Sequence, residues 1–176
     1  MAKQNLWAPW RISYVRDLAT EPGQEPDAPK QCFLCQAGNP ELTAEQHRQQ
    51  LVLISDQRGT LMLNRYPYTN GHLLAAPPPH VADLSDLETA QRNNLMALVE
   101  LGNRLLNEAF NPQGVNVGIN MGRCAGAGLP GHMHFHLVPR WHGDVNFMDV
   151  VGQVRVIPQA LEETYRLLSE TLQRIE

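Results

Sequence analysis

Regular alternation between apolar and polar positions begins near residue 50 and continues to the end of the chain. Five short apolar runs separated by turn residues predict strands over residues 51–54, 60–63, 72–76, 115–121 and 132–138. Two longer segments repeat apolar residues at helical spacing. One follows an S-x-x-E capping box at Ser85 and stops at Pro112, and the other opens at Pro158. This order predicts an α+β fold, an antiparallel sheet with one long and one C-terminal helix on one side.

The first 31 residues follow no such pattern and are predicted to form an N-terminal extension and linker. They begin with an aromatic-rich stretch, and residues 20–30 then hold three prolines and several charges. We therefore expect a single domain over residues 32–176.

Composition narrows the classes of function. The 176 residues are 43% hydrophobic and 18% charged, which suits a globular protein with a buried core. The net charge of -4, with lysine only at Lys3 and Lys30, offers no surface that would follow DNA or RNA. We find no apolar run that spans a bilayer and no signal-peptide pattern, so we expect a cytoplasmic protein without a membrane partner.

The most informative stretch is the last predicted strand, in which three histidines alternate with apolar residues. In a strand, His132, His134 and His136 lie on one face. A polar outer face is one interpretation. A single metal held by all three is disfavoured, because the outer two Cα atoms are about 13–14 Å apart at ~3.4 Å per residue. The third interpretation is a division of labour, in which one neutral imidazole attacks and another orients it or moves a proton.

A glycine-rich loop, residues 122–131, precedes this strand. It is a candidate binding site for the group that an imidazole would attack. It lacks the sequence of a P-loop and leads into a strand instead of a helix. Its small residues, among them Gly126 and Gly128, still let backbone N–H groups approach an anion. On its own such a loop is more often a turn, but beside three histidines it indicates a phosphate cradle. Arg123 at the loop tip is expected to be solvated.

Cys32 and Cys35 form a C-x-x-C pair, which in a reducing compartment indicates a metal or redox site. Two buried thiols without a ligand are the alternative. The redox interpretation is the weaker one, because such pairs normally open a helix in a βαβ pattern. Cys124 lies in the glycine-rich loop and has no predicted role.

His132-Met133-His134-Phe135-His136-Leu137-Val138 resembles the H-φ-H-φ-H-φ-φ signature of the histidine triad (HIT) family of nucleotide hydrolases and transferases. Residues 63–74 are similar to the family's N-x-x-P-x-x-x-G-H segment. Residues 6–11, 118–122 and 139–147 resemble the branch that contains the bacterial diadenosine tetraphosphate (Ap4A) phosphorylases. The resemblance covers roughly residues 5–172.

The resemblance implies a role for each matching residue. His134 would be the nucleophile that attacks an α-phosphate, and His136 would contact the phosphate or the bridging oxygen. Asn64 matches a position that contacts the ribose, and Asn120 one that holds a phosphate or leaving group. Capping of a turn or strand edge is the alternative for both asparagines. Trp141 either stacks on a base or lines the cleft.

The loop departs from the family pattern at one position. Many members carry Gln or Ser there as a leaving-group donor, where this chain has Gly128. Donation would then come from a backbone N–H or from another side chain. The departure leaves open whether water, phosphate or another nucleotide receives the intermediate.

The resemblance also implies a structural zinc site. Some HIT-like proteins complete the C-x-x-C pair with a later histidine and the first histidine of the triad, which here are His80 and His132. Such a Cys2His2 set would hold the strand in place and leave His134 free to react. The alternative is a surface His80 beside two buried thiols.

Three functions follow from these residues and the resemblance. The first is phosphorolysis of Ap4A to ADP and ATP through a nucleotidyl-histidine, with adenine nucleotides and phosphate as partners. The second is a nucleotide hydrolase or phosphoramidase that uses the same chemistry, and the third is a non-catalytic nucleotide-binding module. The resemblance and the many apolar positions of the long helix predict a homodimer.

Overall fold

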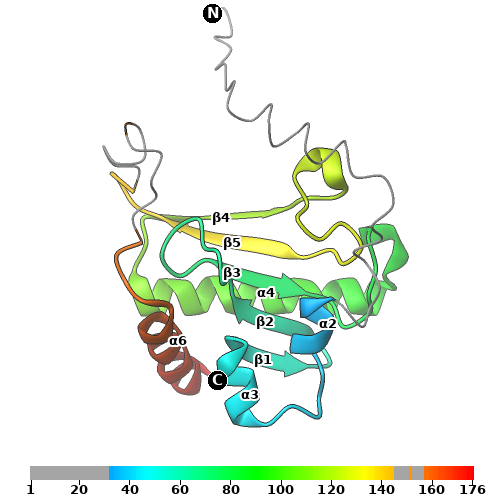
Figure 1. The fold of residues 1–176 in the computed structure, drawn as a ribbon, viewed down its shortest axis with the longest axis horizontal. Coiled ribbons are helices and arrows are strands. Elements are labelled where there is room, and N and C mark those ends of the chain that lie inside the picture. Colours follow the sequence, from blue (N-terminus) through cyan, green and yellow to red (C-terminus); the bar gives the residue numbers. More distant parts are fainter. Residues whose placement is uncertain (1–31, 145–150, 152–156) are drawn as a thin grey trace, which may run out of the picture.

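The computed structural model describes residues 32–144, 151 and 157–176, and its centre is one antiparallel sheet (Figure 1). The strands lie in the order β1-β2-β3-β5-β4, and all four neighbouring pairs are antiparallel. The strands are β1 (Val52–Asp56), β2 (Gly59–Leu63), β3 (Leu73–Ala76), β4 (Gly114–Ile119) and β5 (Phe135–Arg140). The helices are α2 (Phe33–Ala37), α3 (Ala44–Gln49), α4 (Thr89–Phe110) and α6 (Leu161–Ile175).

The two long helices cover one face of the sheet, which confirms the predicted fold class. Leu61, Leu73 and Leu137 point from the strands into a core that also contains Leu98 of α4 and Leu168 of α6. Burial of such side chains, worth about 1.5–3 kcal/mol each, fixes which face of each strand points inward. In Figure 1, α4 runs behind the middle of the sheet, roughly along the direction of the strands.

The opposite face of the sheet is only partly covered. Short helix α2, which was not predicted, packs Leu34 and Ala37 against Met62 and Leu74 in a second small cluster. That cluster lies over the half of the sheet formed by β1, β2 and β3. Helix α2 does not cover the part of this face formed by β5 and β4, where His136 lies.

The long helix begins later than the predicted capping box at Ser85. Residues Leu84–Asp86 form a 3₁₀ turn that is capped by Asp83, and α4 starts at Thr89. The capping box belongs instead to Glu88 and Gln91. The predicted start was wrong by one turn, because an acid and an amide at the same spacing cap the helix further along the chain.

The histidine strand is shorter than predicted. Its ladder with β3 and β4 begins only at Phe135, so His132 and His134 precede the strand. The backbone N–H of Met133 instead donates to the carbonyl of Val81. The alternation still holds, because Met133 and Leu137 point into the core below α4. His132 and His134 are buried, which argues against the interpretation of the three histidines as a polar outer face.

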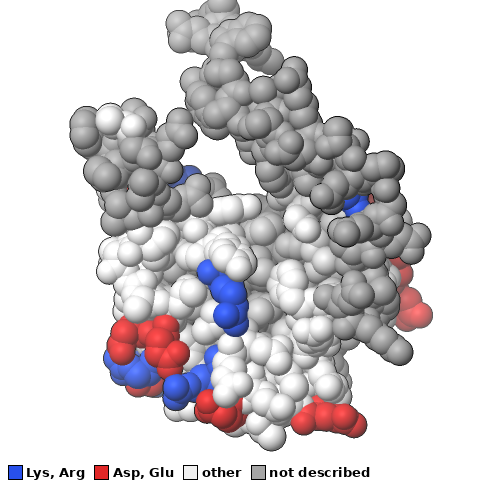
Figure 2. Space-filling model, viewed as in Figure 1, with Lys and Arg blue, Asp and Glu red and all other residues white. Residues whose placement is uncertain are grey.

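Charged side chains on the face seen in Figure 2 gather over α3 and α6. There Arg48 pairs with Glu162, and Arg166 pairs with Glu163 and Glu170. None of the described helices is both long and apolar enough to cross a bilayer. The predicted extension over residues 1–31 and the end of the 139–147 match lie outside the described residues.

Candidate active site and metal-binding group

One row of cross-strand neighbours places His136 at the centre of the partly covered face. Met62 pairs with Leu74, Leu74 with His136, and His136 with Gly118. Helix α2 covers the first two members of the row. Among the described residues, no heavy atom lies within 4 Å of where a Cβ of Gly118 would be, so these residues leave the space beside His136 open. The register of the sheet thus leaves room for a ligand next to one imidazole.

His134 is held as a neutral base with one nitrogen available. Its Nδ1–H donates to the backbone carbonyl of His132 at 2.9 Å, so the lone pair is on Nε2. Burial lowers the pKa of His134, and the hydrogen bond to His132 offsets this only in part. Nε2 has no hydrogen bond to any described residue. The residue therefore has the protonation state and the tautomer that a nucleophile requires.

His136 lies beside this candidate nucleophile and forms a hydrogen bond with a fourth histidine. The ring centroids of His134 and His136 are 4.9 Å apart. Nδ1 of His136 is 2.9 Å from Nε2 of His72, which is fully buried. Burial, followed by the charge of His134, lowers the pKa of His136 to about 4, so this ring is also neutral near pH 7. Two neutral imidazoles therefore stand side by side at the open part of the sheet.

Four side chains from three separate segments meet beside the first histidine of the triad. The Sγ atoms of Cys32 and Cys35 lie 3.3 and 3.4 Å from Nδ1 of His132, and Cys35 Sγ lies 3.2 Å from Nδ1 of His80. All four ligand atoms lie within 4.8 Å of one another. Sulfur and nitrogen ligands at about 2.3 and 2.0–2.1 Å from a tetrahedral zinc would have similar separations.

The chemistry of this group fits a cation. Burial, together with the neighbouring Cys32, raises the pKa of the Cys35 thiol to about 11, so two thiolates here need a positive charge between them. His132 lies 3.0 Å from the carbonyl oxygen of Pro77 through Nε2, which places a proton there and leaves Nδ1 as the ligand atom. Burial lowers the pKa of His132 to about 4, so the ring is neutral, as a metal ligand must be. The group can hold a metal, as predicted.

The predicted nucleotide-binding residues are only partly brought together. Asn64 lies beside the histidines, since its Nδ2 donates to Nδ1 of His72 at 3.2 Å. Asn120 reaches the carbonyl of Gly126 at 3.5 Å and ties the glycine-rich loop to the end of β4. Gly128 is exposed in that loop, and Trp141 follows β5 half-buried, without a described contact to the histidines. Their contacts with a nucleotide remain predictions.

His72 and Tyr68 are the site residues to which sequence reasoning gave no role. The ring of Tyr68 lies 4.6 Å from that of His72 and is stacked at 5.8 Å on that of His136. The available signal was the N-x-x-P-x-x-x-G-H segment, whose final histidine is His72. This signal did not reveal a role for His72, because a histidine at the start of an apolar strand does not indicate that its partner is His136, 64 residues away.

Known proteins share both the sequence pattern and this fold. The family model described as "HIT domain" matches residues 45–143. A Mycobacterium tuberculosis protein named AP-4-A phosphorylase is 38% identical over 167 residues, which is 94% of this chain and 83% of that protein. An uncharacterized HIT-like protein of Saccharolobus solfataricus is 27% identical over 125 residues, or 70% of this chain and 89% of that protein.

Solved structures agree with the sequence relatives. A zinc-bound histidine triad family protein from Mycobacterium smegmatis superimposes with a TM-score of 0.65 at 27% identity, covering 84% of this chain and 97% of the other. A histidine triad nucleotide-binding protein from Sulfolobus tokodaii gives a TM-score of 0.64 at 23% identity, covering 82% and 93%. The second similarity supports the fold alone.

Proposed function

The chain belongs to the HIT family, and on that premise we propose that it is a nucleotidyltransferase that cleaves Ap4A by phosphorolysis to ADP and ATP. The observation that carries the proposal is the hydrogen bond from His134 Nδ1–H to the carbonyl of His132, which directs the lone pair to Nε2. The likeness to the protein named AP-4-A phosphorylase supports the choice of substrate.

The proposed reaction has two displacements at one phosphorus. The lone pair of His134 Nε2 forms a P–N bond to the α-phosphorus, and the P–O bond to the departing ATP breaks with its electron pair on the oxygen. An oxygen of inorganic phosphate then attacks the same phosphorus, which releases ADP and returns the electron pair to Nε2. His136 stands beside the reacting centre, where a hydrogen bond to a phosphate oxygen would stabilise the developing charge.

A product assay tests the proposal. Ap4A is incubated with the protein in the presence and in the absence of phosphate, and the nucleotides are separated. We expect ADP and ATP to appear together only with phosphate. AMP and ATP formed without phosphate would instead indicate a hydrolase, and faster turnover of an adenosine phosphoramidate would indicate a phosphoramidase.

The covalent step is tested separately. After a brief reaction with Ap4A and denaturation at high pH, where a P–N bond survives, mass spectrometry should find one nucleotidyl group on the protein. We expect His134→Ala to lose the adduct and His142→Ala, a change of an exposed ring, to keep it. Nucleotide binding with no adduct on the unmodified chain would favour a non-catalytic module.

We propose that Cys32, Cys35, His80 and His132 hold one structural zinc ion. The ion would neutralise the thiolates and fix His132, whose backbone carbonyl in turn orients His134. The similar histidine triad protein from Mycobacterium smegmatis is zinc-bound, which supports this metal. Metal analysis should find one zinc per chain, lost in Cys35→Ser and kept in the exposed Cys124→Ser.

We propose that the protein is located in the cytoplasm, where cysteine thiols such as those of the metal-binding group are kept reduced. Cell fractionation tests this location.

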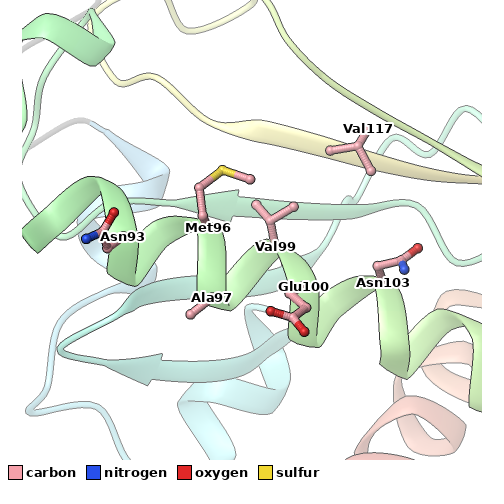
Figure 3. A pocket seen from close by; sticks show the side chains of 7 residues that line it. All are labelled: Asn93, Met96, Ala97, Val99, Glu100, Asn103 and Val117. Atoms are coloured by element: carbon pink, nitrogen blue, oxygen red, sulfur yellow. The ribbon is translucent and has the colours of Figure 1, made fainter. Parts of the chain in front are cut away.

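We propose that two copies associate through the edge of β4. That edge strand is largely exposed and contains neither lysine nor proline to discourage pairing. Beside it lies a groove of about 590 Å³ between β4 and α4, in which Met96 and Val117 are 51% and 45% exposed. Figure 3 shows Met96 and Val99 pointing from α4 toward the strands, with Val117 above them. A second β4 would pair antiparallel and cover these side chains.

Light scattering tests the association. We expect a dimer, and we expect Val117→Lys to give a monomer, because a charge would then be buried at the centre of the interface. Gln57→Lys adds the same charge in the exposed β1–β2 turn and should stay dimeric. A monomer for the unmodified chain at micromolar concentration would contradict the proposal.

A further inference from the structure

We propose that Thr164, on the C-terminal helix α6, is a positioning residue that holds the loop between β2 and β3 against the candidate active site. The inference rests on the proposed function for its purpose, but its structural content concerns only the described side chains. The loop, residues 64–72, carries Tyr68, whose ring is stacked on that of His136 with 5.8 Å between the ring centroids. Thr164 contacts this loop at Asn70, 94 residues earlier in the chain.

The end of the loop is fixed on both sides of Asn70. Thr69 Oγ1 donates to the carbonyl oxygen of Pro139, in β5, at 2.9 Å. Gly71 has a φ of +78°, which favours glycine, and a Cβ there would lie 2.7 Å from the ring of Phe110 at the end of α4. Asn70, between these two contacts, is the residue that connects the loop to α6.

Three polar side chains form this connection. Nδ2 of Asn70 donates to Oε1 of Gln159 at 3.0 Å. Thr164 Oγ1 lies 3.2 Å from Asn70 Oδ1 and 3.2 Å from Gln159 Oε1, and its hydroxyl proton can be donated to either oxygen. The hydroxyl of Thr164 therefore closes a ring of three side chains between the loop and the first turn of the helix.

Thr164 is a polar residue on the buried face of its helix. It is 1% exposed, and Leu168, one turn further along, is fully buried in the core. A buried hydroxyl without a hydrogen bond destabilises the folded state, so an apolar side chain of the same shape would serve packing better. The position holds a hydroxyl that has found its partners in Asn70 and Gln159. Its contribution is therefore to the loop as well as to the core.

The connection reaches the active site through a short stretch of backbone. Tyr68 lies two residues before Asn70, and its ring covers one side of His136. If Asn70 loses its donor, the end of the loop can shift, and the Tyr68 ring moves away from His136. The imidazole is then less well oriented for a hydrogen bond to the phosphate, and displacements of this kind slow a reaction even when they begin far from the reacting atoms.

Two substitutions of Thr164 separate its hydroxyl from its volume. Thr164→Val keeps the branched shape and removes the donor, whereas Thr164→Ser keeps the donor. Thr171→Val is the matched control, because Thr171 is fully buried on the same helix and its Oγ1 accepts from Arg174 of that helix. Circular dichroism and thermal unfolding check that each variant keeps the fold.

The first measurement needs no substrate. The ring current of Tyr68 displaces the NMR signals of the His136 ring protons, and a Tyr68→Leu variant gives the signals without that ring. We expect Thr164→Val to move the His136 signals toward this reference, and we expect Thr164→Ser and Thr171→Val to leave them in place. Unchanged His136 signals in Thr164→Val would overturn the inference.

The second measurement is the single-turnover rate of nucleotidyl-enzyme formation. We expect Thr164→Val to lower this rate by about 2- to 30-fold, the range for residues that are coupled to a site through packed side chains. Thr164→Ser and Thr171→Val should keep the rate of the unmodified chain. A full rate in Thr164→Val, or an equal loss in Thr171→Val, would overturn the positioning role.

Asn70→Ala tests the same connection without a substitution in the core. Because Asn70 is only half-buried, this variant should fold, and we expect it to lose as much rate as Thr164→Val. The double variant should lose no more than either single one, since both changes break one connection. Losses that add, or a fully active Asn70→Ala, would overturn the inference even if Thr164→Val does not fold. If Ap4A is not a substrate while the His136 signals respond as expected, the proposed function fails and the positioning of the loop stands.

Discussion

Replacement of Gly118 by valine should raise the stability of the protein while it lowers the activity. Gly118 pairs with His136 across β4 and β5, and a Cβ at this position would meet no heavy atom of a described residue within 4 Å. Directly opposed Cβ atoms in a sheet are about 4.5–5.5 Å apart. The two methyl groups of valine would therefore stand beside the imidazole of His136, in the space that a phosphate would occupy.

The expected gain in stability and the expected loss of activity have separate physical causes. Glycine within a strand costs roughly 0.5–1 kcal/mol relative to alanine, and valine favours strands further, so Gly118→Val should gain about 1 kcal/mol. For a chain of this length such a gain raises the melting temperature by about 2–4 °C. Displacement of a substrate by about 1 Å from its reactive position costs about 100-fold in rate, and we expect at least that loss in nucleotidyl-enzyme formation.

Gly114→Val is the matched control. Gly114 lies on the same strand and the same face, and it pairs with Arg140 instead of a histidine. A Cβ at Gly114 would likewise meet no atom of the part of the chain that the structure describes within 4 Å. We expect the same gain in melting temperature with full activity. Light scattering on both variants checks that neither changes the association of β4. A Gly118→Val protein that is more stable and fully active would refute the location of the substrate beside His136.

Three further predictions concern the metal, the nucleophile and the core. A strong chelator should lower the melting temperature in thermal scans, because zinc at about 100-fold above its Kd adds roughly 2.7 kcal/mol to the free energy of unfolding. An unchanged melting temperature would argue against a structural ion. Since burial lowers the pKa of His134, nucleotidyl transfer should not decline as the pH falls through 6.5, the ordinary value, but only below it; a midpoint at 6.5 or higher in a pH–rate profile would contradict this. In α4, a Cβ at Gly102 would lie 2.9 Å from Leu137 and 3.1 Å from Leu61, both fully buried, so Gly102→Val should cost about 1–3 kcal/mol in urea unfolding. Gly102→Ala should cost less, because it gains about 1 kcal/mol of helix propensity. If Gly102→Val were as stable as the unmodified chain, the core around Gly102 would have rearranged to accept the larger side chain.

Much of the fold could be predicted because its elements are strongly patterned. The apolar stripe of the last helix and the alternation around Phe135 each report one buried face, and burial selects the same face in the structure. Boundaries were less accurate. Strand β5 begins at Phe135 and carries only His136 of the triad, because neither β3 nor β4 extends far enough to pair with His132 or His134.

The candidate metal group was predicted from its spacing and its resemblance to a family, and the structure brings all four residues together. The fourth histidine of the candidate active site, His72, was given no role in the sequence analysis. A hydrogen bond between His72 and His136 depends on the register of β3 against β5, which no local pattern encodes.

The sequence by itself determined which residues are the candidates for the chemistry. Alternation put His134 and His136 on one face of an extended segment, and two cysteines separated by two residues indicated a metal. Only the tertiary structure decided which ring nitrogen of each histidine carries the proton. The direction of a proton on an imidazole is set by the nearest donor or acceptor in space, and here those are a carbonyl for His134 and, through His72, the N–H of Tyr68 for His136.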